Sequence, residues 1–340
     1  MEDEDYVKRV VQTIKNYEED IINKHSYMQR TFSNSSLKHK KILLDAGLGQ
    51  YLDTLLESVR KNQSVLDEIV QTSGLEIEEK EKKRTYKMDH DRLNDCLYQI
   101  IREWTVEGES DRNPCFKLVQ EELKSIFPEN NDEVVVFVPG CGLARLPFEL
   151  ALDGYQVFAN EVDMFQLLTA SFIMNNCSRK DNYRIYPWIN DLSNRLNSEA
   201  VTTPISFPDI DPNQRPEEFQ FQMVPGDFLQ VDEHLENESV DAIVTTFFID
   251  SAPNVLEFID KIHQLLKPGG IWINFGGLNF VYDAFEDQES CIPVSWEVLK
   301  KSIQHNFVFL KDELVETTYC SQKSMQSVNL KCTFFTCKKQ

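Results

Sequence analysis

A short apolar run that ends in a glycine turn constrains this chain more than any other feature. Residues 134–138 are all Val or Phe, as expected for a strand buried on both faces of a parallel sheet. The run leads into Pro139-Gly140-Cys141-Gly142, and an apolar helical pattern follows over residues 146–152. A strand, a glycine turn and a helix in this order predict the first unit of an α/β fold with right-handed crossovers.

The same alternation of strand and helix continues to about residue 274. Further strands are expected over 156–161, 240–246 and 271–274, and helices over 164–175 and 255–266. Two late strand-like runs, 307–310 and 330–337, have no helix between them, which predicts a C-terminal antiparallel hairpin. The fold class expected is therefore α/β, Rossmann-like, with such a hairpin at its end.

The chain divides into two predicted parts. Residues 1–130 form a helical N-terminal region, in which Gly47 and Gly49 break the apolar helical spacing and 76–84 reads as a charged linker. Residues 131–340 form the Rossmann-like domain. This domain carries an insertion at about 186–216, where five prolines predict a long loop.

Charge and composition exclude several classes of protein. The 340 residues carry a net charge of −21, which disfavours a nucleic-acid partner and favours a neutral or cationic substrate. Eight cysteines include no Cys-x-x-Cys pair, which is consistent with reduced thiols rather than zinc ligands or disulfides. An acidic start and the lack of a long apolar stretch predict no signal peptide and no membrane span. We expect a cytoplasmic protein, with entry into the nucleus left open.

Acidic residues at the ends of the expected strands indicate the ligand. Glu161 ends the strand after Gly140 and can accept hydrogen bonds from the ribose hydroxyls of an adenosine. A dinucleotide-binding fingerprint has a third small residue three positions after its second glycine. Here that position holds the large Arg145, which disfavours NAD. Asp227 and Phe228 provide an acid for the adenine amino group and an aromatic cover, although Asp227 can equally cap a turn. These features favour S-adenosylmethionine over NAD.

Several of these segments resemble one known family. They are 138–146, Asn160-Glu161, Tyr186-Pro187-Trp188, 207–209, Gly226-Asp227-Phe228, 247–250 and 269–274, with Gln99, Arg102 and Trp104 upstream. From about residue 6 to the C-terminus the chain is similar to the carnosine N-methyltransferase family. The resemblance implies a class I methyltransferase that moves a methyl group from S-adenosylmethionine to the imidazole of β-alanyl-histidine, or of histidine in proteins in some members.

The resemblance also implies site residues. The family's cofactor residues fall on Gln99, Arg102, Gly140, Glu161, Asp227, Phe228 and, through its backbone, Ala242. Arg102 would pair with the methionine carboxylate, so the helical N-terminal region would contribute to the cofactor site; read alone, Gln99 and Arg102 are ordinary solvated helix residues.

On the substrate side the match to the family is less complete. Asp250 and Tyr319 match substrate residues, whereas Val281 and Leu330 stand where the family has a His and a Tyr.

The residues also suggest a mechanism. Asp250 can accept the N–H of a neutral imidazole, fix its tautomer and stabilise the positive charge that develops on methylation, with no metal required. Alternatively, Asp250 caps the helix that follows it. The acceptor can also be a histidine in a protein or another small amine, or the chain can be a cofactor-binding relative without activity. The helical region can cover the active site or form a homodimer surface, as the family suggests.

Overall fold

The computed structural model describes residues 2–75, 87–128, 131–280, 291–319 and 324–340, without the side chains of residues 2, 3, 87, 88 and 319. These residues form two compact units. The first contains residues 1–108, 164–214 and 321–327, and the second contains 109–163, 215–320 and 328–340.

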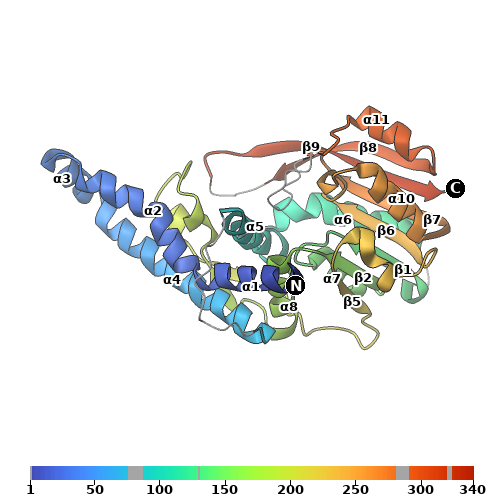
Figure 1. Cartoon of the computed structure of the whole chain (residues 1–340), viewed down its shortest axis with the longest axis horizontal. Coiled ribbons are helices and arrows are strands. Elements are labelled where there is room, and N and C mark those ends of the chain that lie inside the picture. The colour runs from blue at the N-terminus through green and yellow to red at the C-terminus, as the bar shows by residue number, and fades with distance from the viewer. Residues whose placement is uncertain (1, 76–86, 129–130, 281–290, 320–323) are drawn as a thin grey trace. The chain divides into compact units, whose positions relative to one another are not determined.

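The first unit is built mainly from helices (Figure 1). Its N-terminal part has four, α1 (Glu2–Lys15), α2 (Tyr17–Ser33), α3 (Leu37–Asp45) and α4 (Leu48–Ser73). Gly47 breaks the chain between α3 and α4 at a φ of 95°, as predicted, whereas Gly49 lies inside α4. The predicted linker at 76–84 lies outside the described residues. The unit also contains helices α5 (Lys87–Trp104) and α8 (Met164–Asn176).

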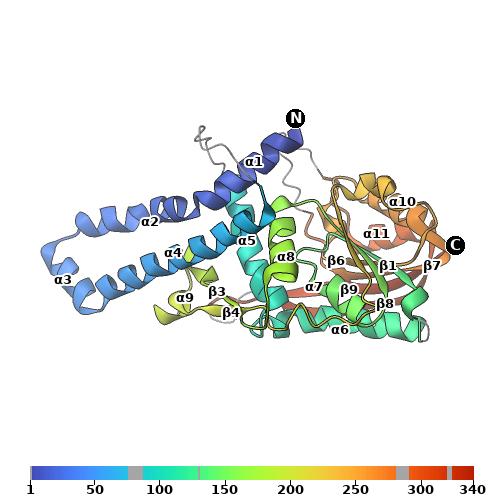
Figure 2. The ribbon, with the colours of Figure 1, turned by 90° about the horizontal axis from the view of Figure 1, so that it is seen from below.

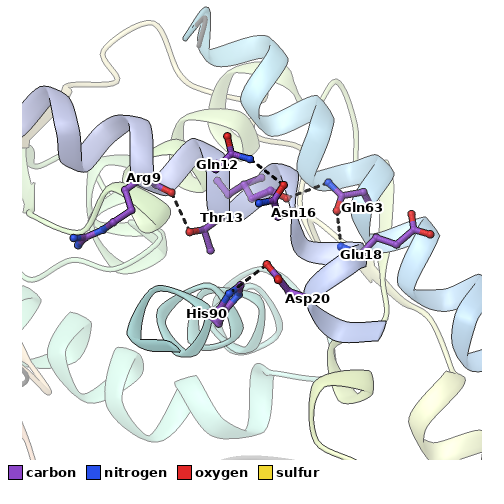
Figure 3. Close-up of polar contacts among 9 residues, drawn as sticks. Arg9, Gln12, Thr13, Asn16, Glu18, Asp20, Gln63 and His90 are labelled. Carbon is purple, nitrogen blue, oxygen red and sulfur yellow. Dashed lines mark hydrogen bonds and ion pairs between the residues drawn. The ribbon is translucent and has the colours of Figure 1, made fainter. Parts of the chain in front are cut away.

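Polar side chains join the helices of this unit. His90 of α5 faces Asp20 of α2 at 3.2 Å, and the backbone N–H of Glu18 donates to Gln63 of α4 at 2.8 Å (Figure 3). Asp89 is fully buried and pairs with Arg9 of α1 at 2.9 Å. Burial raises the pKa of Asp89, and the arginine opposes that rise. The start of α5 is therefore held by an ion pair to α1 and by a polar contact to α2.

The predicted insertion is more ordered than a loop. It lies within a segment that contains strands β3 (Tyr183–Ile185) and β4 (Ile205–Phe207), a 3-10 helix η2 (Pro187–Asn190) and a short helix α9 (Glu199–Thr202). The two strands pair antiparallel. Asn62 of α4 holds this segment, because its side chain accepts from the backbone N–H of Tyr186 at 2.7 Å and donates to the carbonyl of the same residue at 3.0 Å.

The second unit has one seven-stranded sheet in the order β5-β2-β1-β6-β7-β9-β8. Its strands are β1 (Val135–Pro139), β2 (Gln156–Glu161), β5 (Phe221–Pro225), β6 (Val240–Thr246), β7 (Leu266–Gly276), β8 (Phe307–Tyr319) and β9 (Val328–Lys339). The first five run parallel, and β9 is antiparallel to both β7 and β8. The predicted Rossmann-like sheet with a terminal hairpin is thereby confirmed.

Helices cover both faces of this sheet. They are α6 (Glu109–Ile126), α7 (Arg145–Leu152), α10 (Val255–Leu265) and α11 (Trp296–Ile303), with short 3-10 helices at 131–133, 228–233 and 249–251. Phe335 of β9 packs in one apolar core with residues of α10 and α11. Its neighbour Thr336 points the other way and donates to Glu122 of α6 at 2.7 Å, so α6 lies on the opposite face (Figure 2).

Strand β7 is longer than expected. The segment Lys267-Pro268-Gly269-Gly270, which precedes the strand expected at 271–274, lies within it, and pairing with β6 shifts from Val240–Leu266 to Ala242–Ile271. The four intervening residues therefore form a bulge, with Gly269 at a φ of 73°. Among the described residues, no helix is both long enough and apolar enough to cross a bilayer.

Candidate active site

The strand order reverses between β1 and β6, and ligands of such sheets bind where the carboxyl ends of the strands meet at this switch. From β1 the chain moves outward through β2 to β5, and it then returns to the other side of β1 to form β6 and β7. The segments after β1, β2, β5 and β6 therefore share one edge of the sheet in the second unit. Four of the predicted site residues, Gly140, Glu161, Asp227 and Asp250, follow or end these strands.

The glycine turn is joined directly to the acid at the end of β2. Gly140 and Gly142 both have a φ of 60°, the left-handed region that glycine adopts without strain. This curvature directs the N–H of Gly142 at Oε2 of Glu161, 2.9 Å away, and the N–H of Cys141 donates to the carbonyl of Asn160 at 3.0 Å. The structure thus brings together the turn and the acid that the sequence predicted to share a ligand.

Glu161 is buried, with 8% of its surface exposed, and its oxygens accept three backbone N–H groups. Besides Gly142, the donors are Val162 and Asp163, both 2.9 Å from Oε1. Burial raises the pKa of Glu161 to about 7, and these three donors oppose a further rise. An ionised carboxylate offers about four lone-pair positions. One position therefore remains for a ligand hydroxyl, which fits the predicted contact with a ribose.

The segment after β5 is held to the same edge. The N–H of Gly226 donates to the carbonyl of Glu161 at 2.9 Å, and the side chain of Asn160 donates to the carbonyl of Gly226 at 2.8 Å. Asp227 follows and is exposed; its Oδ1 accepts the N–H of Leu229 at 2.8 Å. Asp227 therefore caps a turn, as the alternative interpretation held, while its Oδ2 makes no hydrogen bond within the described part of the chain.

Two predicted cofactor residues occupy the interior of this unit. The ring of Phe228 is 3% exposed and packs against Phe137, Phe248 and Phe258, which leaves little of it to cover an adenine. Ala242 pairs with Val136 of β1, four residues before Gly140. At that register Ala242 lies inside the sheet between β1 and β7, and the structure does not bring it to the edge. The β6 residues that reach the edge are those after Thr245.

Two other predicted cofactor residues belong to the first unit. Gln99 and Arg102 both lie half-buried on α5, and the amide of Gln99 donates to Glu103. Helical spacing of three residues places the two on neighbouring turns.

Arg145 stands where a dinucleotide fingerprint has its third small residue. It begins α7, and its buried side chain pairs with Glu149 at 2.7 Å.

The turn after β6 carries the predicted catalytic acid. Phe248 lies against the glycine turn, since a Cβ built on Gly140 would be 2.2 Å from its Cδ2 atom. Asp250 follows in the 3-10 helix η4 (Ile249–Ser251), and its Oδ2 accepts the N–H of Asn279 at 2.7 Å. Burial raises the pKa of Asp250, and this hydrogen bond opposes the rise. The helix α10 is capped by Asn254, which accepts the N–H of Leu256 at 3.2 Å.

The substrate positions implied by the resemblance are only partly described. Tyr319 is the last residue of β8 and pairs with Val328, but its side chain lies outside the described residues, as does all of Val281. Leu330 lies half-buried on β9 opposite Thr317. The sequence patterns assigned no role to Phe247, Phe248 or Gly276, which shape the turn before Asp250. The sequence feature that could have indicated this turn is the aromatic pair directly after the buried strand.

Comparison with known proteins decides the family. The family model described as carnosine N-methyltransferase matches residues 79–340. The rat carnosine N-methyltransferase is 33% identical over 357 residues, covering 99% of this chain and 88% of the relative.

The chain belongs to the carnosine N-methyltransferase family.

A second member of this carnosine N-methyltransferase family, from Schizosaccharomyces pombe, is 29% identical and covers 87% of this chain and 85% of its own length. Among solved structures, magnesium protoporphyrin IX methyltransferase from Synechocystis with bound SAH has a TM-score of 0.43 at 12% identity, covering 74% of this chain and 97% of that one. Membership of the family makes the chain a methyltransferase, which confirms the class of enzyme predicted from the sequence.

Proposed function

We propose that this methyltransferase uses S-adenosylmethionine to methylate an imidazole nitrogen of carnosine. The position of Asp250 carries the proposal, because the turn that follows β6 sets Phe248 against Gly140 and Asp250 against the exit of β7. An acid is thereby placed beside the edge where Glu161 and the glycine turn meet. The names of the family's members supply the substrate.

We propose the following contacts with the cofactor. At the strand ends, Glu161 would accept a ribose hydroxyl and Asp227 the adenine amino group, whereas Phe228 would act by holding this turn in place. From α5, Gln99 and Arg102 would bind the methionine end, with Arg102 pairing with its carboxylate. The helical region 1–130 would in this way contribute to the cofactor site of the domain at 131–340.

S-adenosylmethionine, when bound, supplies an electrophilic methyl group. The residues of the chain would prepare the acceptor. Asp250 would accept the N–H of the neutral imidazole, which leaves the lone pair of the other nitrogen free to attack. As that nitrogen gains the methyl group, positive charge spreads over the ring, and Asp250 stabilises the charge and takes the ring proton. Burial favours this last step because it raises the pKa of the carboxyl group.

Replacement of Asp250 by Asn tests the proposal. Asn keeps the size of the side chain but cannot take the proton, so kcat with carnosine should fall by about 10²–10⁴-fold. The dissociation constant for S-adenosylmethionine, measured by calorimetry, should stay within about twofold, since Asp250 makes no proposed contact with the cofactor. Asp260→Asn, an exposed position on α10, is the matched control. Unchanged turnover of Asp250→Asn would refute the role.

The acceptor is tested in the same assay. Incubation with methyl-labelled cofactor and either carnosine, histidine-containing peptides or other small amines should label the imidazole of carnosine, as mass spectrometry of the product shows. Label only in peptides or amines would favour the alternatives. Cofactor binding without transfer to any acceptor would indicate a non-catalytic relative.

We also propose a homodimer formed through the helical region. Helix α3 has no buried residue, and Leu37, Ile42 and Leu44 are more than half exposed. Exposed apolar side chains gathered on one segment are typical of protein contacts. Light scattering should give twice the mass of the chain, and a Leu37→Asp, Leu44→Asp double variant should give the mass of one chain. Cytoplasmic location, with or without nuclear entry, stays a prediction for microscopy of the tagged chain.

A further inference from the structure

The turn that carries Asp250 begins with an unusual backbone conformation. Phe247, the first residue after β6, has a φ of 49°. Bulky residues seldom occupy this left-handed region, and they do so where the surrounding structure imposes it, often at functional sites. Whatever holds Phe247 in this conformation therefore also sets the direction of residues 248–250.

The last residue of β7 provides the space for this turn. The N–H of Phe247 donates to the carbonyl of Phe275 at 2.8 Å, and the two rings meet edge to face at 5.7 Å. A Cβ built on Gly276 would lie 3.0 Å from the backbone N of Phe247 and 3.1 Å from its Cα. These neighbours are backbone atoms, so the turn could not yield by rotating a side chain. The missing side chain at 276 thus permits the close approach.

Both anchors of Asp250 depend on this contact. The 247–250 turn brings the carboxyl group from β6, and the N–H that it accepts belongs to Asn279, three residues beyond Gly276 at the exit of β7. The two segments that meet at Gly276 and Phe247 therefore meet again at Asp250 and Asn279. A change in the contact between Gly276 and Phe247 therefore shifts Asp250 relative to Asn279.

We propose that Gly276 is a positioning residue for methyl transfer: its backbone contact with Phe247 fixes the place of the Asp250 carboxyl group. This rests on the role of Asp250 in the proposed function. It predicts that the step at the acceptor is sensitive to the size of residue 276. Cofactor binding is proposed to use the ends of β1, β2 and β5 together with α5, and it should not depend on that size.

The test is a pair of alanine variants at adjacent glycines. In Gly276→Ala the backbone of Phe247 must give way by a few tenths of an ångström, whereas a Cβ on Gly277 meets nothing within 4 Å, and neither glycine has a positive φ. A misplacement of 1 Å can cost about 10²-fold in rate, so a few tenths should lower kcat about three- to tenfold. Gly277→Ala should keep the parent kcat, and both variants should keep the parent dissociation constant for S-adenosylmethionine.

A second readout separates positioning from general loss of structure. Hydrogen exchange at the amide of Asn279 should be faster in Gly276→Ala than in Gly277→Ala, because that amide donates to Asp250. Equal kcat and equal exchange in the two variants would overturn the proposal. So would a loss of cofactor affinity equal to the loss of kcat.

If Gly276→Ala does not fold, Phe247→Gly provides a second test. It keeps Gly276, removes the ring that contacts Phe275 and gives position 247 the backbone freedom of glycine, so the turn is held less tightly. This variant should lower kcat and speed exchange at Asn279, and an unchanged kcat would contradict the proposal. A parent chain that does not methylate carnosine, or whose activity survives Asp250→Asn, would count against the proposed function. An active, Asp250-dependent parent with a normal Gly276→Ala variant would overturn only this inference.

Discussion

Replacement of Gly140 by Ala should lower the free energy of unfolding through two effects that glycine avoids, backbone strain and a clash with Phe248. At a φ of 60° an alanine pays about 1–2 kcal/mol for the left-handed backbone. Its Cβ would also lie 2.2 Å from Cδ2 and 2.9 Å from Cε2 of Phe248, so the ring has to move. Phe248 packs at 4.8 Å against Phe258 in the core, and overpacking of this kind costs about 1–3 kcal/mol. The free energy of unfolding should fall by about 2–5 kcal/mol.

The control for this prediction is Gly154→Ala in the same unit. Gly154 has a φ of 97°, and the nearest atom to a Cβ built there is the Cβ of Asn131 at 3.7 Å, an ordinary contact. This variant should therefore show the backbone cost alone, about 1–2 kcal/mol. Urea unfolding measures both free energies. If Gly140→Ala costs no more than Gly154→Ala, then Phe248 does not set the space above the turn, and the reasoning fails.

Two further predictions concern the buried polar groups. The pKa of Glu161 is about 7 in the folded chain and 4.5 ordinarily, so between these pH values the folded chain holds a proton that the unfolded chain has lost. The free energy of unfolding should therefore fall by about 3 kcal/mol as pH rises from 4.5 to 7. Affinity for S-adenosylmethionine, measured by calorimetry, should rise over about pH 5.5–8 in the parent chain and be independent of pH in Glu161→Gln. Asn62→Ala leaves the backbone N–H and carbonyl of Tyr186 and the hydroxyl of Tyr17 without this partner, so urea unfolding should show a loss of about 2–4 kcal/mol. The exposed Asn23→Ala on α2 should change the free energy of unfolding by close to zero, and a loss below about 0.5 kcal/mol for Asn62→Ala would contradict the bonding seen.

The parts of the site that could be predicted are those fixed by local pattern. An apolar run, a glycine turn and an acid at the next strand's end determine which backbone groups reach the edge of the sheet. In a parallel sheet the ends of neighbouring strands meet there, whatever the rest of the chain does. For this reason the contact between Gly142 and Glu161 follows from the sequence, and so does the place of Asp227.

The parts that could not be predicted depend on contacts between distant residues. Ala242 lies inside the sheet because the register of β6 against β1 is set by long-range pairing, and no local pattern near 242 encodes it. The burial of Phe228 depends on phenylalanines at 137, 248 and 258, which lie far apart in sequence. The order within the insertion rests on Asn62, 124 residues before Tyr186.

Because local pattern fixes some parts of the site and long-range contacts fix others, substitutions should affect the methyl-donor side and the acceptor side differently. The proposed cofactor side of the edge consists mainly of backbone N–H groups and one buried carboxyl group, Glu161, whose positions follow from strand ends and glycines. The proposed acceptor side depends on a turn with an unfavourable φ at Phe247, which lies close to Gly276 and contacts Phe275 through a backbone hydrogen bond and its ring. A substitution on the acceptor side can therefore move Asp250 while the glycine turn and Glu161 stay in place. We accordingly expect chains of this fold to alter their acceptor through the exits of β6 and β7 more readily than they alter their methyl donor.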